Sequence, residues 1–378
     1  MSKTFNNAKN REIPPFRYDI VGSFLRPKRL KDAKKDLEDD KITIDDLKKI
    51  EDEEIIKLVK KQKDAGLKAV TDGEFRRSWW HLDFMWELDN VKKVKTQQGY
   101  IFNGVETRAE TVQLSGKIGF SNHPFLNHYK FLKSIAGEDV LARQTIPSPA
   151  QFLAELQRGD NQIITDKYYK NIDELVADIA NAYKNAIKAF YDLGCRNLQL
   201  DDCTWGMFCD KAYWEARQKD NVDVNEIAKL FARVNNEALK DHPTDMIITM
   251  HVCRGNYNST WAASGGYEPI AEILFGSVNV DGFYLEFDTE RSGDFSPLRF
   301  IGKKQVVLGL ISSKTGELEN KEDIIKRIEE ATKYVDINQL SLSPQCGFAS
   351  TEEGNILTED QQWNKIALVK EIADSIWK

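Results

Sequence analysis

The feature that most constrains this 378-residue chain is a regular alternation of apolar, β-rich runs with amphipathic helical runs. Eight runs are typical of strands, at 19–24, 68–72, 140–147, 197–202, 246–250, 282–287, 306–311 and 339–343. Helical spacing of apolar residues fills most of the gaps, over 44–65, 172–193, 224–239, 321–335 and 358–377. Parallel strands with helical crossovers indicate an α/β fold, and eight such strands close a barrel.

One stretch, at about residues 85–135, departs from this rhythm. Its alternating residues flank Asn103-Gly104, which predicts a β-hairpin-like insertion over the barrel mouth. An open doubly wound sheet is the rival architecture, but its glycine-rich turn, G-x-G-x-x-G, is absent from the sequence. We therefore predict a single (β/α)8 TIM barrel over residues 16–378, preceded by a loosely ordered N-terminus at 1–15.

Composition argues against several classes of partner. The net charge is −7 with lysine and arginine interspersed among acidic residues, so no basic stripe indicates nucleic acid. No apolar stretch reaches 18 residues and the first residues lack a signal-peptide core, so we expect a cytoplasmic protein without membrane contact. Five scattered cysteines favour free thiols or metal ligands over disulfides. These patterns leave the oligomeric state open.

Polar and metal-binding side chains stand at the ends of the predicted strands, although they lie far apart in the chain. The active site of an α/β barrel lies at the carboxyl ends of its strands. The residues at these ends are Ser23, Glu74, Asp201, Asp202, His251, Cys253, Glu286, Ser312, Ser313 and Cys346. One rim of the barrel is therefore expected to carry the chemistry.

Four of these residues form a candidate zinc site. They are His251, Cys253, Glu286 and Cys346. Imidazole, thiolate and carboxylate groups are all zinc ligands, and residues 251 and 253 face the same side of an extended segment. Alone, the H-x-C pair is more typical of a buried cysteine beside a histidine, and it is the other two strand ends that favour a metal. Asp288 or Glu290 is an alternative acidic ligand.

Two thiolates and one carboxylate around Zn²⁺ give the predicted site a formal charge of −1. Such a site favours binding a substrate thiol as a thiolate over activating water, which indicates alkyl transfer to sulfur. Glu74 and Asp201 are candidates to bind an amino group, although an Asp-Asp pair at a strand end is equally typical of a helix cap. Ser23 is a candidate for a substrate carboxylate, with a tight turn as its alternative.

The remaining cysteines, aromatic residues and histidines fit structural roles. Cys195, Cys203 and Cys209 are interpreted as packing residues because the sequence offers them no metal-like partners. Trp79 and Trp80 suit either the barrel mouth or the core. The interpretation for His81, like that for His123, His128 and His242, is a solvent-exposed or structural side chain.

The motifs VGSF, DGE, QLDD, HVCRGN, YLEFD and SPQCGF occur in this order along the chain. With them the sequence resembles the catalytic C-terminal barrel of cobalamin-independent methionine synthase, and above all its shorter, single-barrel bacterial relatives. The resemblance runs from about residue 18 to the C-terminus. It implies methyl transfer to homocysteine, with zinc held by the four candidate ligands and no cobalamin bound.

The same resemblance assigns roles to further residues, and it also shows departures. Homocysteine would contact Val21, Gly22, Ser23, Glu74 and Asp201, and Arg108 falls near the folate-binding region of the family. The N-terminal barrel of the long enzymes is missing, and a folate-stacking tryptophan after the third strand is not evident. The implied catalytic residues are Asp201 and Ser312, the latter where the family has a histidine. Since serine is a poor proton donor, the methyl donor is left as methyltetrahydrofolate or a related carrier.

Three other functions compete with homocysteine methylation. One is zinc-dependent alkyl transfer to another thiol, as in the related coenzyme M transferases, although Glu74 and Asp201 favour an amino-acid acceptor. Another is a metal-free reaction like that of the decarboxylases that share this barrel. The last is a catalytically silent barrel that binds zinc or homocysteine.

Overall fold

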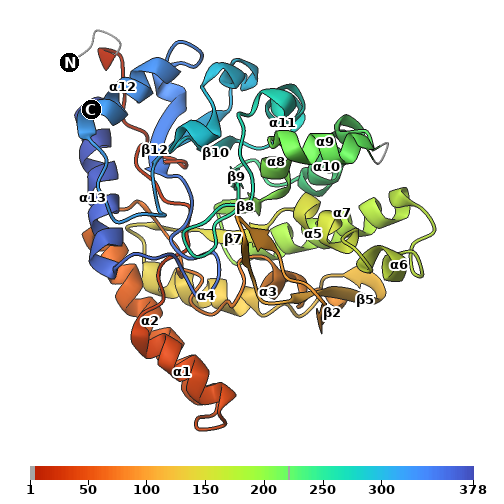
Figure 1. Ribbon diagram of the computed structural model, residues 1–378. Helices are drawn as coiled ribbons and strands as arrows, with labels where there is room; N and C mark the ends of the chain where they lie inside the picture. Colours follow the sequence, from red (N-terminus) through yellow and green to blue (C-terminus); the bar gives the residue numbers. More distant parts are fainter. Residues whose placement is uncertain (1–4, 220–221) are drawn as a thin grey trace.

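The centre of the computed structural model, which describes residues 5–219 and 222–378, is a ring of parallel strands with helices around it (Figure 1). Six strands are paired in the order β12-β11-β10-β9-β8-β7, and β1 pairs with β6. The strands of the ring are β1 (Ala69–Val70), β6 (Leu141–Ala142), β7 (Gln144–Pro147), β8 (Asn197–Asp202), β9 (Ile247–Val252), β10 (Gly282–Glu286), β11 (Gln305–Ile311) and β12 (Leu340–Pro344). The predicted single α/β barrel is confirmed.

The run predicted as the first strand, residues 19–24, differs from the prediction. Residues 19–24 form no strand, and only the preceding residue, Tyr18, makes an isolated bridge, with Leu342 of β12. The Asp19 carboxylate accepts hydrogen bonds from two nearby backbone N–H groups, which are therefore lost to a strand ladder. The segment still lies between β12 and β1 in the ring, because the Phe24 N–H donates to the loop after β1 over 3.1 Å.

The helices predicted over 44–65, 172–193, 224–239, 321–335 and 358–377 each begin within one residue of the predicted position, and the described residues form thirteen α-helices in all. They are α1 (Lys28–Glu38), α2 (Ile44–Asp64), α3 (Leu82–Met85), α4 (Phe125–Ala136), α5 (Pro149–Leu156), α6 (Asn161–Thr165), α7 (Ile172–Asp192), α8 (Thr204–Phe208), α9 (Lys211–Lys219), α10 (Val224–Leu239), α11 (Ala271–Ser277), α12 (Lys321–Ala331) and α13 (Glu359–Ile376). The side chains of Asp223 and Thr358 accept backbone N–H groups at the start of α10 and α13. Gly66 and Gly194 follow α2 and α7 with φ of +82° and +88°.

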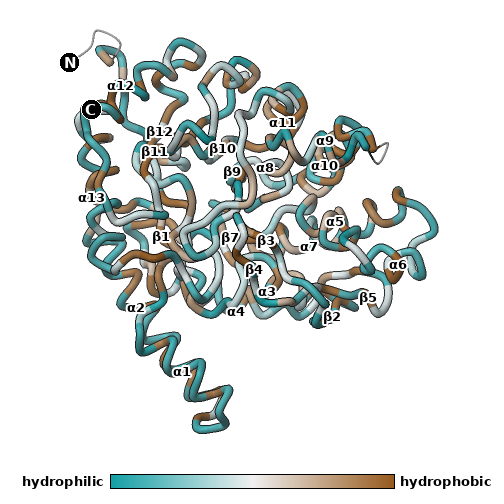
Figure 2. The backbone as a smooth tube through the Cα atoms, in the orientation of Figure 1, coloured by the Kyte–Doolittle hydropathy of each residue, from teal (hydrophilic) through white to brown (hydrophobic). Residues whose placement is uncertain are grey.

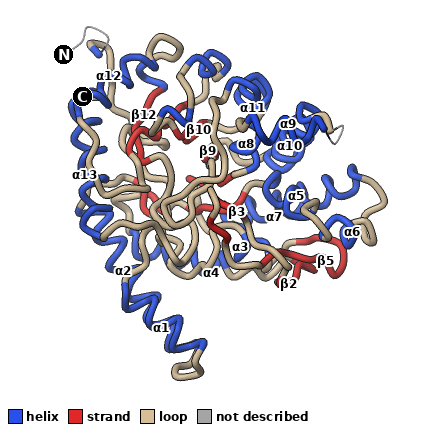
Figure 3. The backbone as a smooth tube through the Cα atoms, viewed as in Figure 1, coloured by secondary structure: helices blue, strands red, loops and turns tan. Residues whose placement is uncertain are grey.

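The predicted insertion is an antiparallel hairpin outside the ring, drawn in red beside α3 and α6 in Figure 3. Its long strands are β2 (Asp89–Lys95) and β5 (Glu110–Gly119). Between them lies a small tip hairpin of β3 (Ile101–Phe102) and β4 (Val105–Glu106). Asn103 and Gly104 turn the chain at this tip with positive φ angles of 42° and 84°, as the Asn-Gly pair predicts.

The outer helices pack one apolar side against the strands. Figure 2 shows hydrophobic and hydrophilic residues alternating along these helices, as expected when one side of each helix faces the ring. Inside the ring, the buried Arg143 guanidinium contacts the Asp19 carboxylate over 2.8 Å, and the Tyr284 hydroxyl donates to the same carboxylate. The interior of the ring therefore contains a buried ion pair whose carboxylate also accepts a hydrogen bond from a tyrosine.

In residues 5–219 and 222–378, no helix has both the length and the apolar character required to cross a bilayer. The predicted loose N-terminus includes residues 1–4, which lie outside the described residues. Beyond them, Phe5 is buried and the Asn10 N–H donates to the Lys378 carbonyl. The domain boundary at residue 16 stays a prediction.

Candidate active site

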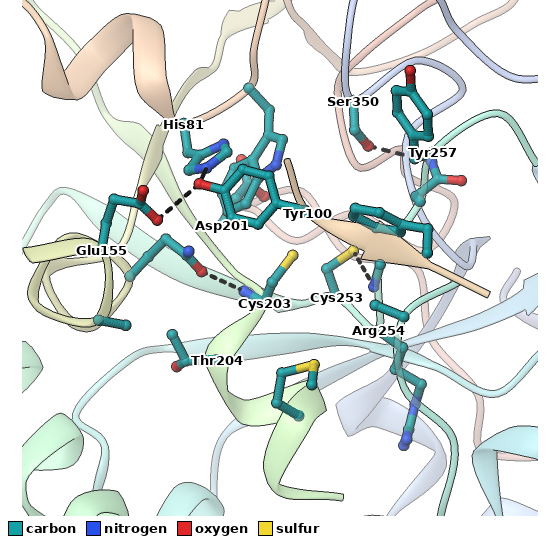
Figure 4. Close-up of a pocket in the computed structure, with 18 of the residues that line it drawn as sticks. His81, Tyr100, Glu155, Asp201, Cys203, Thr204, Cys253, Arg254, Tyr257 and Ser350 are labelled. Carbon is teal, nitrogen blue, oxygen red and sulfur yellow. Dashed lines mark hydrogen bonds between the residues drawn. The ribbon is translucent and has the colours of Figure 1, made fainter. Parts of the chain in front are cut away.

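A cavity of about 770 Å³ opens at the carboxyl ends of the strands. One part of its wall consists of strand-end residues, namely Val21, Ser23, Glu74, Asp201, His251, Cys253 and Cys346. The other part comes from the hairpin tip and the loops after β1, β7 and β9, with aromatic side chains such as Trp80, Tyr100, Phe102 and Tyr257. Figure 4 shows both parts facing one space.

The four candidate metal ligands come together at this wall, where His251, Cys253 and Cys346 line the cavity and Glu286 does not. One ligand atom from each of His251, Cys253, Glu286 and Cys346 lies within 4.8 Å of the others, and all four side chains are buried. His251 belongs to β9 and Glu286 ends β10, while Cys253 and Cys346 follow β9 and β12. The cluster contains Glu286 and neither Asp288 nor Glu290, which were the alternative acidic ligands.

The geometry of this cluster fits a tetrahedral zinc ion. The sulfur atoms of Cys253 and Cys346 are 3.7 Å apart, too far for a disulfide. Two sulfur ligands about 2.3 Å from one zinc ion would lie about 3.8 Å apart. Both ring nitrogens of His251 are buried without a hydrogen-bond partner among the described residues, which leaves one free to bind a cation. The hydrogen bond with Cys253, followed by burial, raises the pKa of Cys346, and a bound dication would lower it again.

Glu286 is held as an acceptor at the edge of the cluster. Its Oε1 accepts the backbone N–H of Arg254 over 2.8 Å, and its Oε2 accepts the Arg291 guanidinium over 3.1 Å. Burial alone would raise the pKa of Glu286, but the positive charges of Lys314 and Arg291 lower it. The carboxylate is therefore ionised and oriented before any ion binds, as supporting hydrogen bonds do in metal sites.

Two carboxyl groups stand beside this cluster. Glu74 Oε1 accepts the Thr145 hydroxyl over 3.0 Å and pairs with Arg77 over 3.2 Å, whereas Glu74 Oε2 is buried without a partner in the described part of the chain. The Gln199 amide donates to Asp201 over 2.8 Å. Burial, followed by the charge of Glu74, raises the pKa of Asp201 well above that of a free aspartate. A positively charged ligand between the two carboxyl groups would relieve this repulsion.

The turn with Val21, Gly22 and Ser23 borders the same cavity. Gly22 has φ of +136°, and a side chain there would meet the methyl group of Thr145 at 3.1 Å, so the turn requires glycine. The Ser23 hydroxyl accepts the Ala349 N–H over 3.3 Å. Val21 and Ser23 line the cavity, and this turn ties the segment before α1 to the loop after β12.

Several predicted site residues lie elsewhere or have a structural partner. Arg108 pairs with Glu352 over 2.9 Å and packs over the Trp79 ring, outside the residues that line the cavity. Ser312 also lies outside the lining, and its N–H donates to Glu319 over 2.8 Å. The roles predicted for Arg108 and Ser312 stay predictions.

Of the two neighbouring aspartates, Asp201 and Asp202, the second has the helix-capping role that was the alternative to substrate binding. Asp202 Oδ1 accepts the Thr204 N–H over 2.7 Å at the start of α8. Asp201, which pairs with His251 in the β8–β9 register, faces the cavity instead. Neighbouring aspartates of one strand thus point to different surroundings, as the alternation of side chains along a strand requires.

Sequence reasoning missed several residues of the cavity wall. His81, interpreted as exposed or structural, is buried and lines the cavity together with Tyr100 and Glu155. Cys203, interpreted as a packing residue, is half-buried and also lines it, close to Cys253 in Figure 4. The one signal in the sequence is the Trp79-Trp80 pair beside His81, since these side chains suit the barrel mouth as well as the core.

Comparisons with known proteins point to one family. A family model described as "Cobalamin-independent synthase, Catalytic domain" matches residues 18–367. "Uncharacterized protein YxjG" of Bacillus subtilis is 49% identical over 373 residues, covering 97% of this chain and 96% of that protein. The crystal structure of the putative vitamin-B12 independent methionine synthase from Listeria monocytogenes has 41% identity and a TM-score of 0.77, with 97% and 100% coverage. A B12-independent methionine synthase from Shewanella sp. W3-18-1, solved with selenomethionine, shares the fold with a TM-score of 0.72 at 18% identity and 95% and 97% coverage.

Proposed function

The chain belongs to the family of cobalamin-independent synthase catalytic domains, a methionine synthase-like family of methyltransferases, and from this premise we propose that it methylates homocysteine to methionine at a zinc centre. The observation that carries the proposal is the buried cluster of His251, Cys253, Glu286 and Cys346 at the cavity wall. We further propose that the protein acts in the cytoplasm and binds no cobalamin.

The metal chemistry follows from the donor set. His251, Cys253, Glu286 and Cys346 would hold the zinc ion. When bound there, zinc would lower the pKa of a substrate thiol, so that the sulfur reacts as a thiolate near neutral pH. Lys314 and Arg291 would offset part of the negative charge that two thiolates and a carboxylate bring to this buried place.

The residues beside the cluster suit the amino-acid part of homocysteine. Glu74 Oε2, which is buried without a partner in the described residues, and the Asp201 carboxyl would accept hydrogen bonds from the substrate ammonium. The turn with Val21, Gly22 and Ser23 would bind the substrate carboxylate through Ser23. That the Shewanella protein was solved with selenomethionine supports amino-acid binding in a barrel of this fold.

The remaining volume of the cavity would hold the methyl donor. Its walls are the aromatic residues of the hairpin tip and the loops around it, which suit a large, partly apolar molecule. We propose methyltetrahydrofolate or a related methyl carrier. The methyl carbon would move to the homocysteine sulfur, and the donor would keep the electron pair of the bond that breaks.

An assay of methionine formation tests the proposal. Purified protein with one equivalent of zinc would be given homocysteine and, in separate reactions, methyltetrahydrofolate monoglutamate, its triglutamate or methylcobalamin. We expect methionine with at least one donor and none after zinc removal by a chelator, with activity restored by added zinc. Methylation of coenzyme M in place of homocysteine would favour the other-thiol function. Homocysteine binding without turnover would indicate a silent barrel.

A further inference from the structure

His81 lines the part of the cavity wall that is formed by the hairpin tip and the loops. We call it the donor part, because we propose that the methyl donor binds there. Nothing in the proposed chemistry uses His81. It is 4% exposed and stands at the start of α3, in the loop after β1. Its ring packs against the Trp80 ring, tilted by 31° with centroids 4.5 Å apart, and meets the edge of Trp79 at 5.9 Å. These contacts hold the imidazole ring in one orientation at the cavity wall.

A chain of hydrogen bonds continues from one nitrogen of this ring. His81 Nε2 lies 3.1 Å from the Tyr100 hydroxyl, which donates to Glu155 Oε2 over 2.8 Å (Figure 4). The Arg158 guanidinium pairs with Glu155 over 3.5 Å and packs over the Tyr100 ring at 3.8 Å. The other Glu155 oxygen accepts the Thr111 hydroxyl, so both oxygens of this carboxylate act as acceptors.

The number of protons available along these hydrogen bonds determines the tautomer and the charge of the His81 ring. A carboxylate paired with an arginine only accepts hydrogen bonds, so the single proton of the Tyr100 hydroxyl points to Glu155. The phenol oxygen can then only accept, and the proton of the imidazole must lie on Nε2. Burial, followed by the nearby Arg158 charge, lowers the pKa of His81 to about 3, which agrees with a neutral ring.

The second nitrogen of His81 is left with a lone pair and no partner. Nδ1 is buried and has no hydrogen-bond partner among residues 5–219 and 222–378. Buried acceptors are rarely left unsatisfied in a native protein, and this one belongs to a residue of the cavity wall. A ligand in the cavity is therefore the natural partner of Nδ1.

We propose that His81, fixed as the Nε2–H tautomer by Tyr100 and Glu155, recognises the methyl donor by accepting a hydrogen bond from it at Nδ1. The donor must then present an N–H or O–H group to this wall, next to the Trp80 ring. His81 is a specificity-determining residue in this arrangement, and Tyr100 and Glu155 are positioning residues. The inference rests on the proposed function, because it needs a second substrate in the donor part of the cavity.

Nitrogen-15 NMR of the histidine side chains tests the tautomer without turnover. The chain has only five histidines, and His81→Asn identifies the signal of His81 by its loss. We expect an Nε2–H tautomer with unprotonated Nδ1 from pH 5 to pH 8, and a changed Nδ1 signal when methyltetrahydrofolate or methylcobalamin is added. Tyr100→Phe should redistribute the two tautomers. An Nδ1–H tautomer, a charged ring at neutral pH or an Nδ1 signal that neither compound moves would overturn the inference.

Kinetics with a pair of matched variants provides the second readout. His81→Phe keeps a ring but lacks the acceptor, and should raise the KM for the donor about tenfold or more while the KM for homocysteine stays unchanged. His81→Asn restores an acceptor oxygen and should recover part of this loss. Equal increases in both KM values would contradict the inference. Absence of methionine formation with every donor would instead contradict the proposed function, and the NMR result would still decide the inference separately.

Discussion

The two parts of the cavity wall differ in how the chain builds them. The part proposed to hold zinc, here called the zinc part, consists of the strand-end residues Val21, Ser23, Glu74, Asp201, His251, Cys253 and Cys346. It comes from neighbouring parallel strands, whose ladder places Asp201 beside His251. The donor part comes from the β2–β5 insertion and loops, where His81 and Tyr100 meet from different connections. The strand ends are set by the barrel itself, whereas the loops are free to vary without altering the fold. A family with this architecture can therefore retain its thiol chemistry and change its methyl donor.

The largest effect is expected when a candidate zinc ligand is replaced, which should change metal binding without changing the donor part. Cys253→Ser or Cys346→Ser should weaken zinc binding by at least ~100-fold, because four ligands share a binding free energy of about 10–16 kcal/mol. Activity should be lost with the metal. Zinc content after dialysis against a chelator, measured by mass spectrometry, checks this expectation.

Cys195→Ser is the matched control for these variants. Cys195 is fully buried outside the cluster, and its thiol donates to the Asn197 carbonyl over 3.4 Å, a hydrogen bond that a hydroxyl can also make. Its zinc content should equal that of the unchanged protein. If all three variants retained zinc equally, the cluster would not be the metal site.

The next effect separates substrate binding from metal binding. Glu74→Gln and Asp201→Asn should each raise the KM for homocysteine by about 10- to 150-fold, since a hydrogen bond to a charged group contributes about 1.5–3 kcal/mol. Zinc content and the KM for the donor should stay the same. Steady-state kinetics with each substrate varied in turn measures both values.

Asp202→Asn offers the comparison from the same strand. Asp202 caps α8 and accepts the Ser148 hydroxyl, so its loss should lower the free energy of unfolding by about 1–3 kcal/mol. The KM for homocysteine should not change. A larger KM effect at 202 than at 201 would reverse the assignment of the two aspartates.

The same contrast explains how far the sequence could predict this site. Hydrophobic periodicity predicted the barrel and its helices, and the barrel in turn brought His251, Cys253, Glu286 and Cys346 to one rim. These residues were predictable because strand order determines which strand ends are neighbours. The irregular course of the 19–24 segment was not predictable, since the Asp19 side chain accepts the Ile20 N–H, which a strand ladder would otherwise use.

The donor part of the wall could not be predicted in the same way. Tyr100 lies just before β3 of the insertion and Glu155 lies on α5, and no pattern within either segment indicates that the two side chains meet. Their contact depends on how the hairpin folds over the mouth, which is a matter of tertiary packing. The same reason hides the role of His81, since its hydrogen-bond partner Tyr100 lies 19 positions further along the chain.

The third effect is the pH dependence of amino-acid binding, which depends on the protonation of Asp201. Asp201 is surrounded by Glu74, Arg77 and Gln199, with Arg143 further inside the ring, and burial followed by Glu74 raises the pKa of Asp201. Ammonium binding needs the ionised carboxylate, so protons compete with the ligand as the pH falls through this raised pKa. The affinity for the amino acid should therefore fall by up to about tenfold for each unit that the pH decreases. This fall should occur at a pH well above that at which an ordinary aspartate is protonated.

Norleucine is the suitable ligand for that series, because it carries the ammonium and carboxylate groups without a thiol. Calorimetry from pH 5 to pH 8 should show the decrease in the unchanged protein and a flatter profile in Asp201→Asn. A decrease of the same steepness in both proteins would assign the proton to another group.

The smallest expected effect concerns the hairpin tip. Phe102 packs against Tyr257, with ring centroids 5.6 Å apart, and a side chain at Gly255 would lie 2.8 Å from the Phe102 ring. The tip thus closes over the loop after β9. Phe102→Ala removes an aromatic contact of about 0.5–1.5 kcal/mol and should raise the KM for the donor by about 2- to 12-fold. The KM for homocysteine and the zinc content should not change.

Phe120→Ala is the matched control for this last prediction. Phe120 follows β5 of the same insertion and stacks on His123, with ring centroids 5.3 Å apart, away from the cavity lining. It should alter the stability of the insertion without altering either KM value. An equal rise of both KM values in Phe102→Ala would show that the tip acts on the whole cavity. The two parts of the wall would then work as one, and a change of donor would require changes in the zinc part as well.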